Sequence, residues 1–150
     1  MPNPVKPRPT PEQLARYSEV FNDSATLKHF GVKVHFPDAD TVEVVIEDVK
    51  PEQRGGLGSD AMNGGVLAAV FDLAIGCTPA LIDPTRRSAT VQLSINFMRA
   101  VRGNRVVARA KIDRAGDVLL FASAQILDEK GQVCATCTGM SRLSDLPWQG

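Results

Sequence analysis

Hydrophobic and polar residues alternate along much of this chain with the period of two that predicts half-buried β-strands. The alternation is cleanest over residues 90–98, where one set of side chains is expected to face the core and the other to form a polar face. The core set is Val91, Leu93, Ile95 and Phe97, and the polar set is Thr90, Gln92, Ser94, Asn96 and Met98. In all, the pattern predicts six strands, at residues 30–36, 41–47, 90–98, 105–113, 118–127 and 133–142.

A long apolar segment separates the second predicted strand from the third. It predicts a buried helix from about Gly64 to Leu81, beginning directly after Asn63. The segment is long enough to span a membrane, but the charge of Asp72 near its centre and the presence of Pro79 make exposure to lipid costly. We therefore expect a core helix of a soluble protein with no membrane partner.

Before the first strand, the sequence predicts a proline-rich tail and a short helix at residues 11–22, with Thr10 as its cap. Residues 48–60 contain a proline and three glycines without a periodic pattern, so they are expected to form a loop that leads into the central helix. Short turns between the last strands imply antiparallel pairing. The order of elements predicts an α+β fold with a curled antiparallel sheet around one long central helix, as a single domain at residues 30–145 after the tail and helix of residues 1–29.

Charge and cysteine content narrow the classes of function. The 150 residues carry 17 basic and 17 acidic side chains and the pI is about 6.7, so no overall field attracts nucleic acid or an anionic membrane. The N-terminal residues lack the apolar core of a signal peptide, which favours a cytoplasmic protein. Cys134 and Cys137 have the spacing of redox and zinc motifs, but they fall in a predicted strand, where residues three apart point to opposite faces. We therefore expect no metal site.

Asp72 and the segment Asn63-Gly64-Gly65 are the candidate chemical groups of the central helix. A carboxylate in a buried helix must be neutralised, paired or used, unless it turns to solvent or makes a hydrogen bond in the core. The N–H groups at the glycine-rich start can bind an oxyanion, although capping alone would explain Asn63. Gly64 and Asp72 are eight residues apart, about 12 Å along a helix. If both act on one substrate carbonyl, they come from different subunits.

The combination of Asn63-Gly64-Gly65, Asp72 and the strand from Thr90 to Arg99 resembles the hotdog-fold acyl-CoA thioesterases, and most closely their phenylacetate-degradation branch. The resemblance covers roughly residues 30–143. It implies a hotdog thioesterase domain that hydrolyses an acyl-CoA to the free acid and CoA, with no metal or organic cofactor. It also implies a homodimer with two interfacial sites, often paired again into a homotetramer.

The resemblance implies a role for each candidate residue. Asp72 would be the nucleophile or the general base, Thr90 would hold the hydrolytic water, and Gly64 would supply the oxyanion N–H. Gly65 would lie against the substrate. Asn63 stands where the family usually has a histidine; it can orient the thioester carbonyl, but it cannot titrate near neutrality.

Coenzyme A carries phosphates, so basic residues are expected around the cleft. Arg99, Arg102 and Arg114 are the candidates, with solvated turn arginines as the alternative interpretation. The turn from Arg114 to Gly116 resembles the one that lies against pantetheine in relatives, so both of its ends are predicted to contact the substrate.

Two other functions remain as alternatives. A non-catalytic hotdog module that binds acyl-CoA is motivated by Asn63, although too few residues precede Phe30 to form a DNA-binding output unit. A hotdog dehydratase needs an acid and a base together in the cleft, and neither histidine of the chain lies beside Asp72 in the motif. Hydrolysis of a thioester is the function that the sequence favours.

Overall fold

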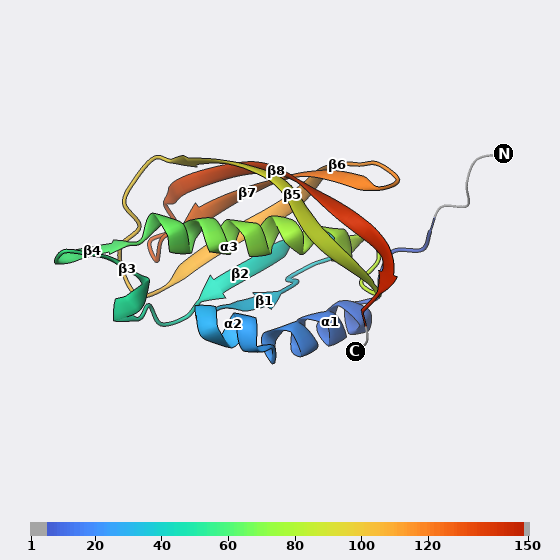
Figure 1. Cartoon of the computed structure of the whole chain (residues 1–150), viewed down its shortest axis with the longest axis horizontal. Coiled ribbons are helices and arrows are strands. Elements are labelled where there is room, and N and C mark those ends of the chain that lie inside the picture. The colour runs from blue at the N-terminus through green and yellow to red at the C-terminus, as the bar shows by residue number, and fades with distance from the viewer. Residues whose placement is uncertain (1–5, 149–150) are drawn as a thin grey trace.

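Six strands form one antiparallel sheet that curls around a single long helix (Figure 1). The structure is a computed structural model that describes residues 6–148. The strands of this sheet are β1 (Lys33–His35), β2 (Val42–Ile46), β5 (Arg86–Phe97), β6 (Val106–Ala115), β7 (Leu119–Leu127) and β8 (Val133–Pro147). Their order across the sheet is β1-β2-β6-β7-β8-β5, and every neighbouring pair is antiparallel. The predicted α+β architecture is confirmed.

The central helix α3 (Gly64–Gly76) fills the concave side of the sheet, because most of its surface is apolar (Figure 1). Gly139 on β8 allows a close approach, since a Cβ at this position would lie 3.1 Å from the side chain of Ile75. The segment Gly64–Leu81 is long and apolar enough to resemble a membrane span, but 56% of it is buried within the domain. The buried residues of α3 are Leu67, Val70, Phe71, Ala74 and Ile75.

The α-helix ends earlier than predicted. It stops at Gly76, and the chain continues to the expected end as a 3₁₀ turn, η2 (Thr78–Leu81). Pro79 has no N–H to donate to the carbonyl of Ile75, and the Thr78 hydroxyl donates to that carbonyl instead, at 2.7 Å. Pro79 therefore makes the last part of the predicted helix a 3₁₀ turn instead of an α-helix.

Helix α1 (Pro11–Asn22) is confirmed as predicted. The side chain of Thr10 accepts a hydrogen bond from the N–H of Gln13, and the Gln13 side chain accepts from the N–H of Thr10, which forms a capping box. Leu14 of this helix belongs to the same buried cluster as α3. The N-terminal helix is thus packed onto the sheet domain.

A second N-terminal helix, α2 (Ala25–Phe30), occupies residues where a strand was expected to begin. Ser24 caps its start, and Gly31 ends it with a φ of 68°, in the left-handed region that favours glycine. The prediction of a strand from residue 30 is therefore wrong, and β1 begins only at Lys33. Alternation over so few residues did not distinguish the end of a short helix from the start of a strand.

Strand β5 differs most from its predicted pattern. It begins at Arg86 rather than Thr90, and its register against β8 shifts by one residue between Thr90 and Gln92. Val91 is the extra residue of a β-bulge, which reverses the alternation of side chains on its two sides. Thr90 therefore faces α3 instead of the predicted polar face, and Val91 is 53% exposed instead of lying in the core.

The predicted loop at residues 48–60 contains regular structure. It holds a 3₁₀ turn, η1 (Pro51–Gln53), and a two-stranded ribbon of β3 (Arg54–Gly56) and β4 (Ser59–Met62). The ribbon projects beyond the N-terminal end of α3 (Figure 1). It leads the chain directly into the helix cap.

Gln53 connects this segment to two helices. Its buried side chain donates from Nε2 to the carbonyl of Phe30 at 2.6 Å and accepts at Oε1 from the N–H of Lys50 at 2.9 Å. Its backbone carbonyl accepts from the N–H of Asn63 at 2.9 Å. Gln53 thus fixes the start of α3 relative to the end of α2.

We predict that Gln53→Leu lowers the free energy of unfolding by about 1–3 kcal/mol, because the Phe30 carbonyl and the Lys50 N–H lose their partner. Urea denaturation followed by circular dichroism measures this change. Gln132→Leu, at an exposed position, is the matched control and should stay within about 0.5 kcal/mol of wild type. Equal stability of the two variants would contradict the assignment.

Candidate active site

The N-terminus of α3 presents a backbone donor at the surface. Asn63 caps the helix, since its Oδ1 accepts from the N–H groups of Gly65 at 2.8 Å and Val66 at 3.3 Å. Among residues 6–148, no acceptor lies on the N–H of Gly64, and the three residues from Asn63 to Gly65 are exposed. This N–H lies at the positive end of the helix dipole and can donate to an oxyanion.

Asp72 lies further along α3 on a strip that the sheet leaves open. It is exposed in the single chain, which is the alternative in which this side chain turns to solvent. In the part of the chain that the structure describes, this carboxylate forms neither an ion pair nor a hydrogen bond. The Asp72 carboxylate is therefore available to an incoming molecule.

Thr90 approaches Asp72 from β5. Its hydroxyl donates to the backbone carbonyl of Asp72 at 3.3 Å, and the side chain is partly buried. Gly76 makes this approach possible, because a Cβ at residue 76 would lie only 2.9 Å from Thr90 Oγ1. The bulge in β5 and the glycine in α3 together bring the hydroxyl to the helix.

The two halves of the predicted site lie at different places on one chain. A Cβ at Gly64 would lie 3.8 Å from the ring of Phe97, at the end of β5, whereas Asp72 lies beside Thr90, seven residues earlier on the same strand. Both groups are on α3, with about 12 Å of helix between them. A single chain therefore does not bring the Gly64 N–H and the Asp72 carboxylate to one carbonyl.

The predicted CoA-binding residues are also separated in one chain. The N–H of Arg99 bonds to the carbonyl of Cys134, where β8 begins, whereas Arg114 lies opposite Phe121 at the other end of the sheet. Gly116 forms a tight turn in which its N–H donates to the Leu119 carbonyl at 2.8 Å. The third candidate, Arg102, forms an ion pair with Asp60.

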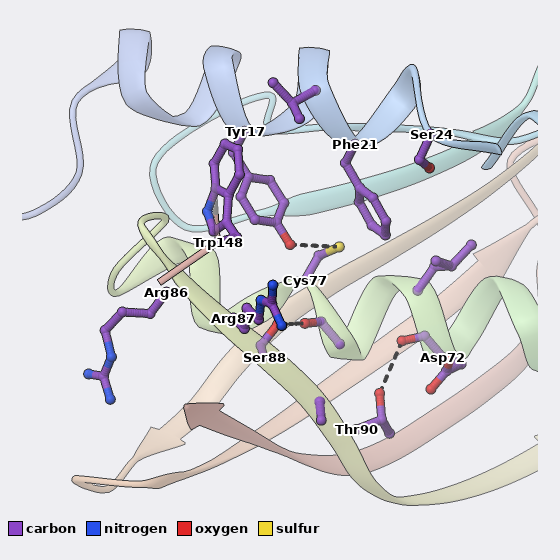
Figure 2. Close-up of a pocket in the computed structure, with 14 residues that line it drawn as sticks. Tyr17, Phe21, Ser24, Asp72, Cys77, Arg86, Arg87, Ser88, Thr90 and Trp148 are labelled. Atoms are coloured by element: carbon purple, nitrogen blue, oxygen red, sulfur yellow. Dashed lines mark hydrogen bonds between the residues drawn. The ribbon is translucent and has the colours of Figure 1, made fainter. Parts of the chain in front are cut away.

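A groove of about 580 Å³ opens beside Asp72, between α1 and the first half of β5 (Figure 2). Its size lies within the usual range for small-molecule sites. Most of its residues were not predicted from the sequence, because they come from α1, the end of α3, β5 and the residue after β8, and no local motif connects these segments. They include Tyr17, Phe21, Cys77, Ser88 and Trp148.

Tyr17 and Cys77 meet in the wall of this groove. The Tyr17 hydroxyl lies 3.7 Å from Cys77 Sγ, and burial raises the pKa of Tyr17 above its ordinary value. Burial also raises the pKa of the Cys77 thiol to about 12; the contact with Tyr17 opposes this shift and the negative charge of Asp72 adds to it. Both groups are therefore neutral at physiological pH and unsuited to act as a nucleophile.

Comparison with known proteins supports the sequence resemblance. The family model of the thioesterase superfamily matches residues 60–135. A medium/long-chain acyl-CoA thioesterase of Salmonella typhimurium, YigI, is 27% identical over 103 residues, which cover 59% of this chain and 66% of the relative.

Solved structures share the fold. A Shewanella oneidensis protein related to the thioesterase superfamily has a TM-score of 0.79 and 26% identity, with 91% of this chain and 100% of that one covered. The Escherichia coli PaaI protein from the phenylacetic acid degradation operon has a TM-score of 0.76 at 16% identity, covering 91% and 97% of the two chains.

The raised pKa of Cys77 predicts a loss of stability at alkaline pH. Between its ordinary pKa of 9.0 and about 12, the unfolded chain releases the thiol proton while the folded chain retains it. The free energy of unfolding should therefore fall as pH rises through this window, by up to about 1.4 kcal/mol per pH unit from this group. Urea denaturation at several alkaline pH values should give a shallower slope for Cys77→Ala; identical slopes would count against the shift.

Proposed function

Because the chain belongs to the thioesterase superfamily, we propose that it hydrolyses an acyl-CoA thioester to the free acid and CoA at a site formed between two copies of the chain. The observation that carries this proposal is the unpaired, exposed carboxylate of Asp72 beside the Thr90 hydroxyl. The similarity to an acyl-CoA thioesterase supports CoA as the thiol. Within the superfamily, the residue pattern favours the phenylacetate-degradation branch.

The free edge of β5 supports self-association as a homodimer. This strand ends the sheet and has twelve residues, a length at which an uncovered edge promotes aggregation. It also exposes apolar side chains, with Val91 at 53% and Phe97 at 55%. Antiparallel pairing of this edge with its copy, about a twofold axis, would satisfy its backbone groups and cover these side chains.

This pairing would also complete the site. If the twofold axis passes through Ser94, Thr90 of one copy stands opposite Phe97 of the partner subunit, because Val91 is the extra residue of the bulge and is not counted. Thr90 lies beside Asp72, and Phe97 lies beside Gly64. Each interface would therefore bring the Asp72 carboxylate of one copy towards the free Gly64 N–H of the other, twice per dimer.

The chemistry then follows from the groups present. Water held by Thr90 attacks the thioester carbonyl carbon, and Asp72 accepts the proton of that water. The partner's Gly64 N–H stabilises the oxyanion of the tetrahedral intermediate, at a helix end that Asn63 caps. Collapse of the intermediate breaks the carbon–sulfur bond, and the thiolate of CoA takes up the proton. Direct attack by the Asp72 carboxylate, followed by hydrolysis of the anhydride, is the alternative route.

The same pairing would place Arg99 of one copy and Arg114 of the partner subunit in the same half of the dimer. Arg99 follows the end of β5, and Arg114 lies, through Phe121 and Met140, at the level of Gln92 in the middle of β5. Antiparallel pairing would bring Arg99 of one copy to the half of the sheet that holds the β6–β7 turn and Arg114 of the partner subunit, where both can bind CoA phosphates. Gly65 and Gly116 would border the pantetheine. A dimer of dimers would use the polar outer face of the sheet.

A second candidate function is favoured by one observation. Asn63 uses its side-chain oxygen to cap α3 and has no titratable group. A protein that binds acyl-CoA without turnover would have the same groove and interface. The following experiments separate the two functions.

We predict that Asp72→Asn lowers kcat for thiol release from acyl-CoA by about 10²–10⁴-fold, because the amide cannot accept the proton of water. Free thiol is measured with a chromogenic disulfide across a panel of acyl-CoAs. Circular dichroism and size-exclusion chromatography should show an unchanged fold and dimer. Retained turnover in the variant, or its absence in wild type, would contradict the proposal.

The intersubunit site predicts complementation between two inactive variants. Gly64→Pro removes only the N–H, and the site tolerates proline because residue 64 is the first of the helix and Asn63 has a compatible ψ of 132°. It should lower kcat by about 10²–10³-fold. Gly64→Ala keeps the N–H and should lower it much less.

A heterodimer of Gly64→Pro with Asp72→Asn contains one site in which both groups are intact. Purified through two different tags, it should regain about half of the wild-type activity, whereas each parent dimer stays inactive. If the heterodimer is as inactive as its parents, the two groups do not meet across the interface.

A further inference from the structure

The groove beside Asp72 has two distinct ends (Figure 2). Asp72 and Thr90 lie at one end, where the proposed reaction takes place. Tyr17 and Trp148 lie together at the other, and Phe21 of α1 points into the space between them. The groove therefore leads from the reacting groups to an aromatic wall under the N-terminal helix.

Several contacts hold this wall in place. The Tyr17 and Trp148 rings meet edge to face, with centroids 5.8 Å apart and planes at 85°. The indole N–H of Trp148 donates to the carbonyl of Pro84, and its backbone N–H donates to Thr85 at 3.2 Å. At its base, the Tyr17 hydroxyl contacts the buried Cys77, which caps the C-terminal end of α3. The wall is thus fixed to the helix and to the segment before β5.

The distance between Asp72 and the aromatic wall limits the length of a chain that the groove can hold. Cys77 follows Asp72 by five residues, which is about 7.5 Å along the chain at the helical rise. An extended chain advances about 1.2 Å per bond. About six bonds therefore separate a carbonyl beside Asp72 from the Tyr17 ring, which corresponds to about seven to eight carbons with the carbonyl carbon included.

We propose that this groove holds the acyl part of the substrate, and that Tyr17 and Trp148 limit it to about eight carbons. The assignment of the carbonyl end rests on the proposed hydrolysis at Asp72. Leu73, Val20 and Phe21 supply apolar surface along the way. Each methylene buried there should strengthen binding about fourfold, until the chain reaches the wall.

Trp148 is the single tryptophan of the chain, so its fluorescence reports on the occupied groove. The probes are S-alkyl-CoA thioethers with about four to fourteen carbons, which cannot be hydrolysed. In wild type, Kd should fall about fourfold per methylene and level off near eight carbons. Binding that does not depend on chain length, or no binding at all, overturns the inference.

Truncation of Tyr17 should allow the groove to hold a longer alkyl chain. In Tyr17→Ala, Kd should keep falling beyond eight carbons, so that a ten-carbon probe, with two further methylenes, binds about 16-fold tighter than to wild type. Tyr17→Leu, which preserves an apolar contact for α1, should give the same direction with less risk to folding. Phe30→Ala, at an exposed aromatic residue outside the groove, is the control and should keep the wild-type profile. An unchanged profile in both Tyr17 variants means that the limit is set elsewhere.

Hydrolysis of the matching acyl-CoA series separates this inference from the proposed function. If the thioethers bind with the expected profiles but no acyl-CoA releases thiol, the groove is confirmed and hydrolysis is wrong. If acyl-CoAs are hydrolysed with a length preference that Tyr17→Ala does not change, hydrolysis stands and the acyl groove is wrong.

Discussion

The burial of one apolar helix governs this structure. Nearly every side of α3 is hydrophobic, so a flat sheet, which covers only one side, would leave much of it in water. The sheet curls around the helix instead, and the N-terminal helices add to the buried cluster through Leu14 and Leu27. The uncovered strip carries Asp72, the one charged residue of the helix. The same packing that buries most of α3 thus leaves the Asp72 carboxylate exposed to solvent.

A single extra residue in β5, Val91, determines which residue of the sheet lies beside this carboxylate. Without the bulge at Val91, Thr90 and Phe97 would point to opposite faces, because they are seven residues apart on a strand. With the bulge, Thr90 faces the helix, and Phe97 lies beside Gly64 at the other end of it. The edge strand β5 therefore lies beside both groups of the candidate site, Asp72 and Gly64. A symmetric pairing of this edge with its copy can bring Asp72 of one subunit towards Gly64 of the other.

The N-terminal helix adds a specificity element to this framework. Helix α1 covers the groove next to Asp72. Trp148, which follows the last strand, closes the far end of the groove. The groups inside that space, Tyr17 and Cys77, are neutral because burial raises the pKa of each. The groove therefore offers apolar surface beside Asp72, with Arg86 and Arg87 of β5 as further charged residues of its lining, and the apolar part would suit the hydrophobic acyl chain of the proposed thioester.

The sequence by itself determined the fold class, the antiparallel sheet and the central helix, because periods of two and an unbroken apolar run depend on neighbouring residues only. It also singled out Asn63, Gly64 and Asp72, whose roles remain predictions. It placed Thr90 on the wrong face, left the exposure of Asp72 open and missed the groove. The tertiary structure decided these points. A bulge depends on the partner strand, exposure depends on where the curled sheet ends, and the groove joins residues as distant as Tyr17 and Trp148.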